Sequence, residues 1–478
     1  MAQFQNLIAG EWTSSTNDIA NINPSDTNDV IGHYAQATKD QAEDAIAAAH
    51  DAFATWGHSS IQQRSDCLDA IGNEILARKE ELGHLLSREE GKTLPEGIGE
   101  AARAGQIFKF FAGEALRNTG DVVSSVRPGI SVEISREPLG PIAIITPWNF
   151  PIAIPAWKIA PALAFGNTVV FKPAALVPGS AHALAEIISR AGLPDGVFNL
   201  VVGSGSEIGG LLLNDRRIKG VSFTGSTQTG QKVAAASSAR NARYQLEMGG
   251  KNPLVVMGDS DLAGAVECAV QGAFFSTGQR CTASSRLIVE RSVHDEFVAA
   301  LKDRVDALTI GDALAEGTQI GPVVDQRQLD QNLEYVAIGK GEGATLLTGG
   351  ERLELGKPGF YQKPALFVDT SNAMRINQEE IFGPVASVIA VDDLDEAIHV
   401  ANDTQFGLSA GICTSSLRSA SAFKRNSQAG MVMVNAPTAG VDYHVPFGGT
   451  KGSSFGPREQ GAYARDFYTV VKTAYTNA

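Results

Sequence analysis

The sequence has few cysteines, and their spacing matches neither a disulfide framework nor a metal site. The four are Cys67, Cys268, Cys281 and Cys413. A structural zinc site would need cysteine or histidine pairs a few residues apart. We therefore expect no bound metal, and a reduced protein of the cytoplasm is the simplest interpretation.

Long apolar runs and an excess of basic charge are also missing, and we expect no secretory leader. No apolar run approaches the roughly 18 residues that predict a membrane helix. Met1–Leu7 has neither the charged nor the apolar region of a secretory signal. The 53 acidic residues outnumber the 39 basic ones, so the formal charge is −14. Because nucleic acids and anionic membranes attract basic surfaces, we expect neither as a partner.

The chain does have the length and apolar content of a multidomain globular protein. Its 478 residues are 43% hydrophobic and 19% charged, which predicts two or three domains with large cores. After a mostly helical first quarter, apolar runs alternate with helical patterns. These runs are 142–145, 168–171, 197–201, 220–223 and 244–246. Such alternation is typical of a parallel sheet covered by helices, with nucleotides bound at the carboxyl ends of its strands.

A second alternation of strand and helix patterns follows Gly249-Gly250 and continues to residues 431–434. Residues 121–137 alternate polar and apolar positions at strand period and predict a projecting hairpin. The strand-like residues 467–472 are a candidate to pair with it. We therefore expect an α/β fold with two Rossmann-like parallel-sheet domains and a small β hairpin and tail.

Three separate segments carry the residue types of an acyl-transfer site. Cys281 follows a Gly-Gln-Arg turn, Glu247 ends a strand before two glycines, and Asn149 lies between prolines. A thiolate nucleophile needs a base nearby and a donor for the oxyanion that forms when it attacks a carbonyl. Arg280 offers a cation that can hold the thiolate. Taken singly, a lone cysteine is more often a buried structural residue.

The dinucleotide fingerprint G-x-G-x-x-G is absent. The nearest pattern, Gly203, Gly205 and Gly209, has one residue too many, and each glycine by itself is more often a plain turn. Residues 223–226 end a strand and open a helix, a place where backbone amides can face a phosphate.

Together these segments resemble the NAD(P)-dependent aldehyde dehydrogenase family over essentially the whole chain. The shared motifs, in the family's order, are Thr146–Pro151, Phe223–Ser226, Leu246–Lys251, Gly278–Cys281, Glu380–Val385 and Pro446–Gly449. The resemblance implies that Cys281 is the nucleophile. Asn149 and the backbone N–H of Cys281 would bind the oxyanion, and Glu247 would activate the water that releases the acid. A catalytically silent relative, the alternative from another class, has no reason to keep all three residues.

The resemblance also implies a bound NAD or NADP, with its riboses held by Lys172 and Glu380. The other residues that it places near the cofactor are Thr146, Pro147, Trp148, Ala175, Gly205, Gly209, Thr224, Gly225, Ser226 and Phe382. NAD-preferring relatives often carry a glutamate where this chain has Ala175. A 2′-phosphate is therefore not repelled here, and Lys172 can pair with it. We expect NADP to be favoured over NAD or equal to it.

The substrate expectation comes from the C-terminal stretch. Residues 440–449 and 451–461 resemble the branch of the family that oxidises α-ketoglutaric semialdehyde. Relatives that act on succinate semialdehyde commonly carry arginines at the positions of Trp157 and Phe275, so that substrate is disfavoured here. Arg280 is then the candidate partner for a distal carboxylate, beside a structural role next to the cysteine.

Four aromatic residues predict an apolar wall in the substrate pocket. They are Phe150, Trp157, Phe275 and Phe447. Because such a wall suits uncharged chains, another semialdehyde, or a broad range of aliphatic or aromatic aldehydes, stays an alternative.

The resemblance further implies a division of the chain into three regions. Residues 1–120 and 139–248 would bind the cofactor, 249–455 would form the catalytic domain, and 121–138 with 456–478 would serve oligomerisation. Family members are dimers or tetramers, so we expect a homodimer or a homotetramer assembled through the hairpin and tail.

Overall fold

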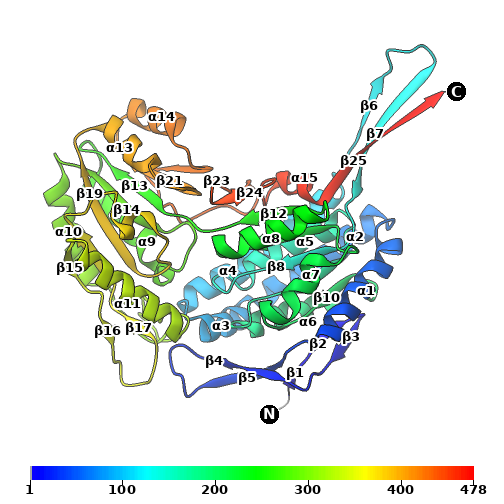
Figure 1. The fold of residues 1–478 in the computed structure, drawn as a ribbon, viewed down its shortest axis with the longest axis horizontal. Coiled ribbons are helices and arrows are strands. Elements are labelled where there is room, and N and C mark those ends of the chain that lie inside the picture. The colour runs from blue at the N-terminus through cyan, green and yellow to red at the C-terminus, as the bar shows by residue number, and fades with distance from the viewer. Residues whose placement is uncertain (1–2, 478) are drawn as a thin grey trace.

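The computed structural model describes residues 3–477, which form two sheet-centred bodies and a projecting arm (Figure 1). The predicted fold class, α/β with two parallel-sheet bodies and a β hairpin and tail, is confirmed. Within these residues, no helix combines the length and the apolar character needed to cross a membrane.

The first body is built on an eight-stranded sheet. In spatial order its strands are β24 (Ser454–Phe455), β12 (Arg243–Glu247), β11 (Gly220–Thr224), β8 (Ile142–Ile145), β9 (Val169–Lys172), β10 (Phe198–Leu200), β2 (Asn6–Ile8) and β3 (Glu11–Thr13). The parallel strands β8 to β12 are those predicted from the first alternation. Their apolar residues are buried because helices cover both faces of the sheet.

Helices pack on both faces of this sheet (Figure 1). They are α1 (Lys39–Trp56), α2 (Ile61–Ala77), α3 (Lys79–Glu90), α4 (Leu94–Ala115), α5 (Ala153–Ala164), α6 (Pro178–Ser189), α7 (Gly210–Asn214) and α8 (Thr227–Ala239). A capping box of Thr38 and Gln41 opens α1. Helix α4 packs on α2 and α5, and its first turn reaches the second body, where Leu94 N donates to Ala313 O at 3.0 Å.

The second body contains a seven-stranded sheet. Its strands in order are β15 (Thr345–Thr348), β18 (Ala365–Val368), β19 (Val385–Val391), β14 (Ser284–Glu290), β13 (Asn252–Val256), β21 (Ser409–Cys413) and β22 (Met431–Val434). The helices of this body are α9 (Leu262–Ala273), α10 (His294–Asp306), α11 (Gln326–Gly341), α12 (Arg375–Gln378), α13 (Leu394–Asn402) and α14 (Leu417–Asn426). Separate apolar cores lie on the two faces of the sheet.

Short strands complete the two bodies. They are β1 (Gln3–Phe4), β5 (Val30–Ala35) and β4 (Asp18–Ile22) in one sheet, β16 (Arg352–Leu353) with β17 (Tyr361–Gln362), and β20 (Phe406–Gly407) with β23 (Thr450–Lys451).

The arm is a three-stranded antiparallel sheet of β6 (Asp121–Ser124), β7 (Ile130–Pro138) and β25 (Thr469–Asn477). The predicted pairing of the tail with the hairpin is confirmed, but the strand begins later than predicted. Phe467 and Tyr468 belong to the short helix α15 (Arg465–Tyr468) and are buried in the first core. Burial of these two aromatic rings anchors the base of the arm. The extended strand therefore begins at Thr469.

Candidate active site

Cys281 lies in a tightly bent loop between α9 and β14. Just before it, Ser276, Thr277 and Gly278 have φ values of 51°, 57° and 65°, a left-handed region that costs most residues energy. A Cβ at Gly278 would lie 2.3 Å from Gly383 O. Ser276 is compensated by hydrogen bonds, because its N and Oγ donate to Glu96 at 2.9 and 2.8 Å. Contacts from other segments therefore set the shape of the nucleophile loop.

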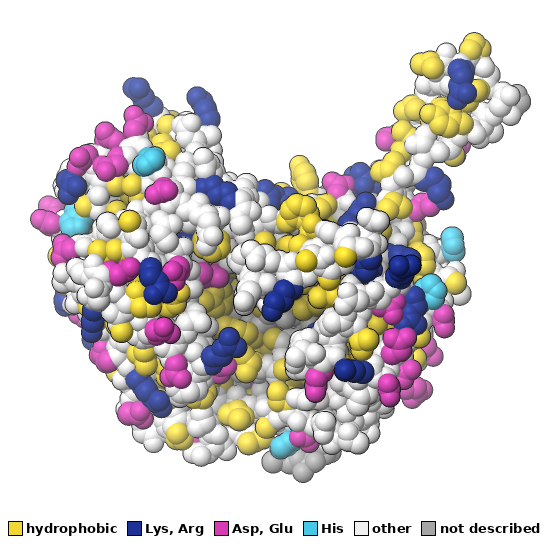
Figure 2. All heavy atoms as spheres, in the orientation of Figure 1, with side chains coloured by type: hydrophobic (Ala, Val, Ile, Leu, Met, Phe, Trp, Pro, Cys, Tyr) yellow, Lys and Arg dark blue, Asp and Glu magenta, His cyan; other side chains and the backbone are white. Residues whose placement is uncertain are grey.

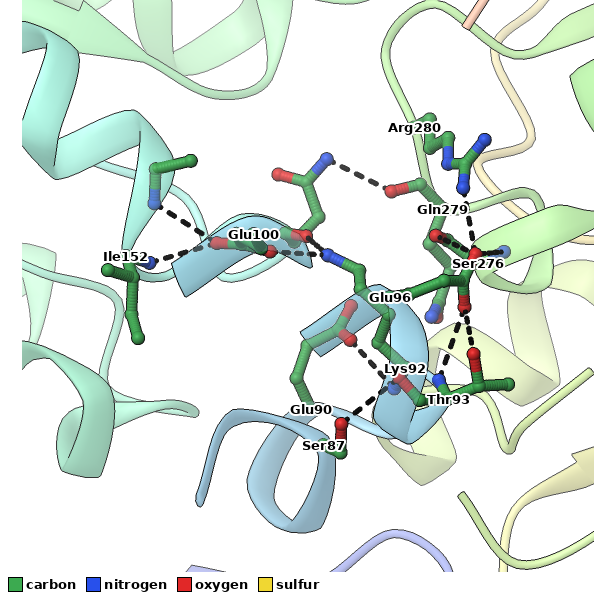
Figure 3. Close-up of polar contacts among 12 residues, drawn as sticks. Ser87, Glu90, Lys92, Thr93, Glu96, Glu100, Ile152, Ser276, Gln279 and Arg280 are labelled. Atoms are coloured by element: carbon green, nitrogen blue, oxygen red, sulfur yellow. Dashed lines mark hydrogen bonds and ion pairs between the residues drawn. The ribbon is translucent and has the colours of Figure 1, made fainter. Parts of the chain in front are cut away.

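Glu96, in the first turn of α4, clamps this loop (Figure 3). Its Oε1 also accepts from Arg280 Nη2 at 2.8 Å, and its Oε2 accepts from the N and Oγ of Thr93 at 3.2 and 2.8 Å. Arg280 is thus paired with a carboxylate rather than available to hold the thiolate. Its structural role beside the cysteine is the interpretation that this geometry favours.

A buried ion pair joins the same helix to the Asn149 segment (Figure 3). Lys92 Nζ lies 2.7 Å from Glu100 Oε2 and donates to Asn149 O at 2.8 Å. Glu100 Oε1 accepts from the backbone N of Ile152 and Ala153 at 3.0 and 3.1 Å. Buried charges are tolerated when they are paired and hydrogen-bonded in this way. The network fixes the turn that carries Asn149.

The amide of Asn149 meets the nucleophile loop directly. Its Nδ2 donates to Gln279 O, two residues before Cys281, at 3.0 Å. The side chain of Asn149 is buried, and it ends on a donor group beside the loop of the sulfur. A side-chain amide in this place is a candidate oxyanion donor.

Glu247 ends β12 with its carboxyl group buried. Its Oε2 accepts from Ser454 Oγ at 2.5 Å. Burial and the neighbouring Glu459 raise the pKa of Glu247 well above its usual range, against smaller lowering effects from Ser454, Lys158 and Arg458. Its pKa also responds to the buried pair of Lys158 and Glu459 that lies beside it. A carboxyl group with a raised pKa is suited to accept a proton near neutral pH.

The thiol of Cys281 is half-buried. Burial, with the charges of Glu380 and Glu247, raises its pKa to about 12. In the free protein the sulfur is therefore protonated at neutral pH, and a base is needed to form the thiolate.

A cavity of about 240 Å³ opens beside Cys281. This is below the roughly 300–1,000 Å³ of drug-sized sites, so it suits a small substrate. Phe150, Trp157 and Phe447 line it together with Arg280, and the rings of Trp157 and Phe447 stack at 5.4 Å. Phe275, the fourth aromatic residue predicted here, instead packs against the core of the second body.

Most of the predicted cofactor residues lie at one edge of the first sheet. Thr146, Pro147 and Trp148 follow β8, Lys172 ends β9, Ala175 follows it, Thr224 ends β11, Gly225 follows it, and Ser226 caps α8. This is the carboxyl edge of the parallel strands, where nucleotides bind in such sheets. A Cβ at Gly205 or Gly209 would meet nothing within 4 Å, so neither glycine is needed for packing.

Several buried polar groups at this edge have few or no hydrogen-bond partners among residues 3–477. Lys172 Nζ is buried, and within residues 3–477 it donates only to Pro173 O, at 3.2 Å; burial lowers its pKa to about 8. The hydroxyls of Thr146 and Thr224 are buried without a partner among the described residues. Buried groups of this kind are usually satisfied by a ligand or water. They fit the hydroxyl and phosphate groups of a dinucleotide.

Glu380 and Phe382 approach this edge from the second body. Glu380 Oε1 accepts from Gly250 N at 3.0 Å, and burial raises its pKa to about 7. Phe382 makes an edge-to-face contact with Trp148 at 5.4 Å. The two bodies thus bring Trp148 into contact with Phe382 and place the charge of Glu380 near Cys281.

The sequence interpretation missed the charged residues that support the site. Lys92, Glu96 and Glu100 belong to the quarter of the chain in which no chemistry was identified. The signal was present, because Glu100 falls at the helical spacing of the buried apolar residues Ala104, Ile107 and Phe111, where a charge is unexpected without a partner. Lys158, the single charge in the apolar helix α5, also indicates a buried partner.

Comparison with known proteins gives one consistent result. The sequence profile of the aldehyde dehydrogenase family matches residues 12–474. The chain is 45% identical to an α-ketoglutaric semialdehyde dehydrogenase of Bacillus subtilis, covering 99% of this chain and 98% of that one. It is 43% identical to an α-ketoglutarate semialdehyde dehydrogenase of Haloferax volcanii, with 98% of each chain covered. A crystal structure of betaine aldehyde dehydrogenase from Staphylococcus aureus with NAD⁺ superimposes with a TM-score of 0.97 at 34% identity, covering 99% and 95% of the two chains.

Proposed function

The chain belongs to the aldehyde dehydrogenase family, and on that premise we propose that it oxidises α-ketoglutaric semialdehyde (2,5-dioxopentanoate) to 2-oxoglutarate with NAD(P). The observation that carries this proposal is the small cavity lined by Cys281 together with Phe150, the neighbour of Asn149, and residues of helix α4. The full-length similarity to two semialdehyde dehydrogenases supports the choice of substrate.

We infer the role of each catalytic residue from its position. The proton of the Cys281 thiol passes to water, and the thiolate attacks the aldehyde carbon. The resulting oxyanion is stabilised by Asn149 Nδ2 and the N–H of Cys281. NAD(P), when bound, supplies the hydride acceptor. The acyl group then remains on Cys281 as a thioester. Glu247 takes a proton from the water that attacks this thioester, and the acid leaves.

The experiment that tests the proposed substrate is a comparison of kcat/KM across aldehydes. The panel contains α-ketoglutaric, succinic and glutaric semialdehydes and the uncharged pentanal. We expect the highest kcat/KM for α-ketoglutaric semialdehyde. The aromatic wall of Phe150, Trp157 and Phe447 favours a second candidate, a broad aldehyde dehydrogenase, and a higher kcat/KM for pentanal than for every semialdehyde would select it.

We propose that NADP is used at least as well as NAD. Ala175 follows Lys172 at the carboxyl edge of the sheet, so no carboxylate at this position repels a 2′-phosphate. Ala175→Glu is expected to lower kcat/KM for NADP about tenfold or more relative to NAD, because the two negative charges repel. The measurement is kcat/KM for each cofactor at saturating aldehyde.

Ala175→Gln is the matched control, because it has nearly the same size without the charge. If it changes the cofactor ratio as much as Ala175→Glu, charge is not the cause. A wild-type kcat/KM for NADP a hundredfold below that for NAD would contradict the proposed preference itself.

We propose that the protein is a homodimer or a homotetramer assembled through the arm. The arm stands clear of both bodies and carries hydrophobic side chains (Figure 2). Val122 and Val471 are 81% and 60% exposed, although solvent disfavours such apolar groups on an isolated hairpin. We expect light scattering to give a multiple of the 50.3 kDa chain mass.

Charges placed on the arm are expected to weaken this association. The double variant Val122→Asp, Val471→Asp should shift the measured mass towards that of one chain. Thr476→Asp, also an exposed position on the arm, is the control for added charge alone. A wild-type protein with the mass of a single chain would contradict the proposal.

A further inference from the structure

Helix α4 presents a row of charged residues to the substrate cavity. Glu96, Glu100 and Arg103 all line it, at helical spacings of four and three residues that put them on one face. Glu96 is paired with Arg280 at 2.8 Å, and Glu100 with Lys92 at 2.7 Å. Each of these carboxylates thus already neutralises a cation of the cavity wall.

Arg103 differs from the other two cations. Among residues 3–477, no carboxylate forms an ion pair with it, and Glu100 and Asp442 influence it only from a distance. Its Nη2 donates to the neutral side-chain oxygen of Gln460 at 3.2 Å. Because a guanidinium group stays charged in proteins, Arg103 is the surplus positive charge of the cavity.

The guanidinium group also has an unused donor. Arg103 Nε is buried and has no partner among the described residues. The bond to Gln460 leaves the rest of the planar fork free to donate. Arg280 Nε is buried without a partner among residues 3–477 in the same way, so the unused donor alone does not distinguish the two arginines. The distinction is that Arg280 is paired with Glu96, whereas no carboxylate among these residues pairs with Arg103.

We propose that Arg103 binds the distal carboxylate of the substrate. This inference rests on the proposed oxidation of a semialdehyde, and it gives that reaction the charge recognition that its substrate requires. Guanidinium and carboxylate groups form two parallel hydrogen bonds, which fix the orientation of the acid. Phe150, Trp157 and Phe447 then cover the carbon chain, and the aldehyde end points to Cys281. Arg280 loses this role, because Glu96 already neutralises it.

The test is the variant Arg103→Met, which keeps a chain of similar length and removes the charge. For α-ketoglutaric semialdehyde, kcat/KM is expected to fall by roughly 10- to 100-fold, mostly through a higher KM, which is the usual range for a lost charged hydrogen bond. For pentanal, kcat/KM is expected to stay within about twofold. Unchanged pentanal oxidation also shows that the variant is folded. Arg103→Lys, which restores the charge without the fork, is expected to recover part of the loss.

Arg117→Met, which removes an exposed arginine just beyond the end of the same helix, is the matched control and should leave both substrates unchanged. Equal losses for both substrates in Arg103→Met would overturn the proposal in favour of a structural role. No loss for any semialdehyde would overturn it as well.

The same panel separates this inference from the proposed substrate. If the wild-type protein prefers succinic or glutaric semialdehyde, the proposed substrate is wrong. Should Arg103→Met then still lower kcat/KM for the acids and not for pentanal, Arg103 nevertheless binds their carboxylate. If Arg103→Met leaves the ratio of kcat/KM for the acidic aldehydes to kcat/KM for pentanal unchanged, Arg103 does not bind the carboxylate. This conclusion holds whichever aldehyde is preferred.

Discussion

Cys281→Ala is expected to abolish aldehyde oxidation, with kcat lowered by about 10⁴-fold or more, as for other lost nucleophiles. Without the sulfur, no thioester forms and hydride transfer has no tetrahedral precursor. Cofactor binding should survive, because Glu96 and the left-handed residues Ser276 and Thr277 shape this loop independently of the thiol. Turnover is followed at 340 nm, and cofactor affinity by quenching of protein fluorescence.

The control for the loss of a thiol is Cys67→Ala, a cysteine in the apolar core of the first body. It is expected to keep turnover near the wild-type level. Residual oxidation by Cys281→Ala at a tenth of the wild-type rate would show that another group is the nucleophile.

Glu247→Gln is expected to stop the reaction after its first half. The amide cannot accept a proton from water, so the thioester on Cys281 is no longer hydrolysed efficiently, and the steady-state rate falls by about 10²- to 10⁴-fold. Mixing with aldehyde and cofactor should give a burst of about one reduced cofactor per site. Mass spectrometry should then find the acyl group on the protein.

Glu186→Gln, on the surface of α6, is the control and should hydrolyse the thioester at the normal rate. A Glu247→Gln variant with an unchanged steady-state rate and no acyl-enzyme would exclude Glu247 as the base.

The pH dependence of the wild-type enzyme tests the same assignment. A base works only in its deprotonated form, and burial together with Glu459 raises the pKa of Glu247. Thioester hydrolysis is therefore expected to slow as pH falls through this raised pKa, at a pH above the usual carboxyl range, and to level off above it. The residual hydrolysis rate of Glu247→Gln should not show this decrease at low pH. A wild-type hydrolysis rate that decreases only around the ordinary pKa of glutamate would contradict the environment described for this side chain.

Some of the fold follows from local sequence signals. The strands β8 and β9 were the most predictable, because they are buried and read as nearly continuous apolar runs between helical patterns. The strand β21, next to the edge of the second sheet, was not predicted, since Ser409–Cys413 has a single β-branched residue. It is a strand because it lies between β13 and β22, which supply its hydrogen bonds. Phe467 and Tyr468 also differ from the prediction, because both aromatic rings are buried in the first core and the backbone there forms α15 instead of a strand.

The sequence by itself determined the kind of chemistry: a thiol, a carboxyl group and an amide are in the chain whatever its fold, and their flanking motifs carry the family resemblance. Only the tertiary structure decided which residues hold these groups in place, what their pKa values are and which charges are paired. Arg280 and Arg103 look alike in the sequence, yet one meets Glu96 and the other meets a neutral amide. The physical reason is that pKa and net charge depend on burial and on neighbours distant in the chain, and those are set when the first body, with α4, packs against the second.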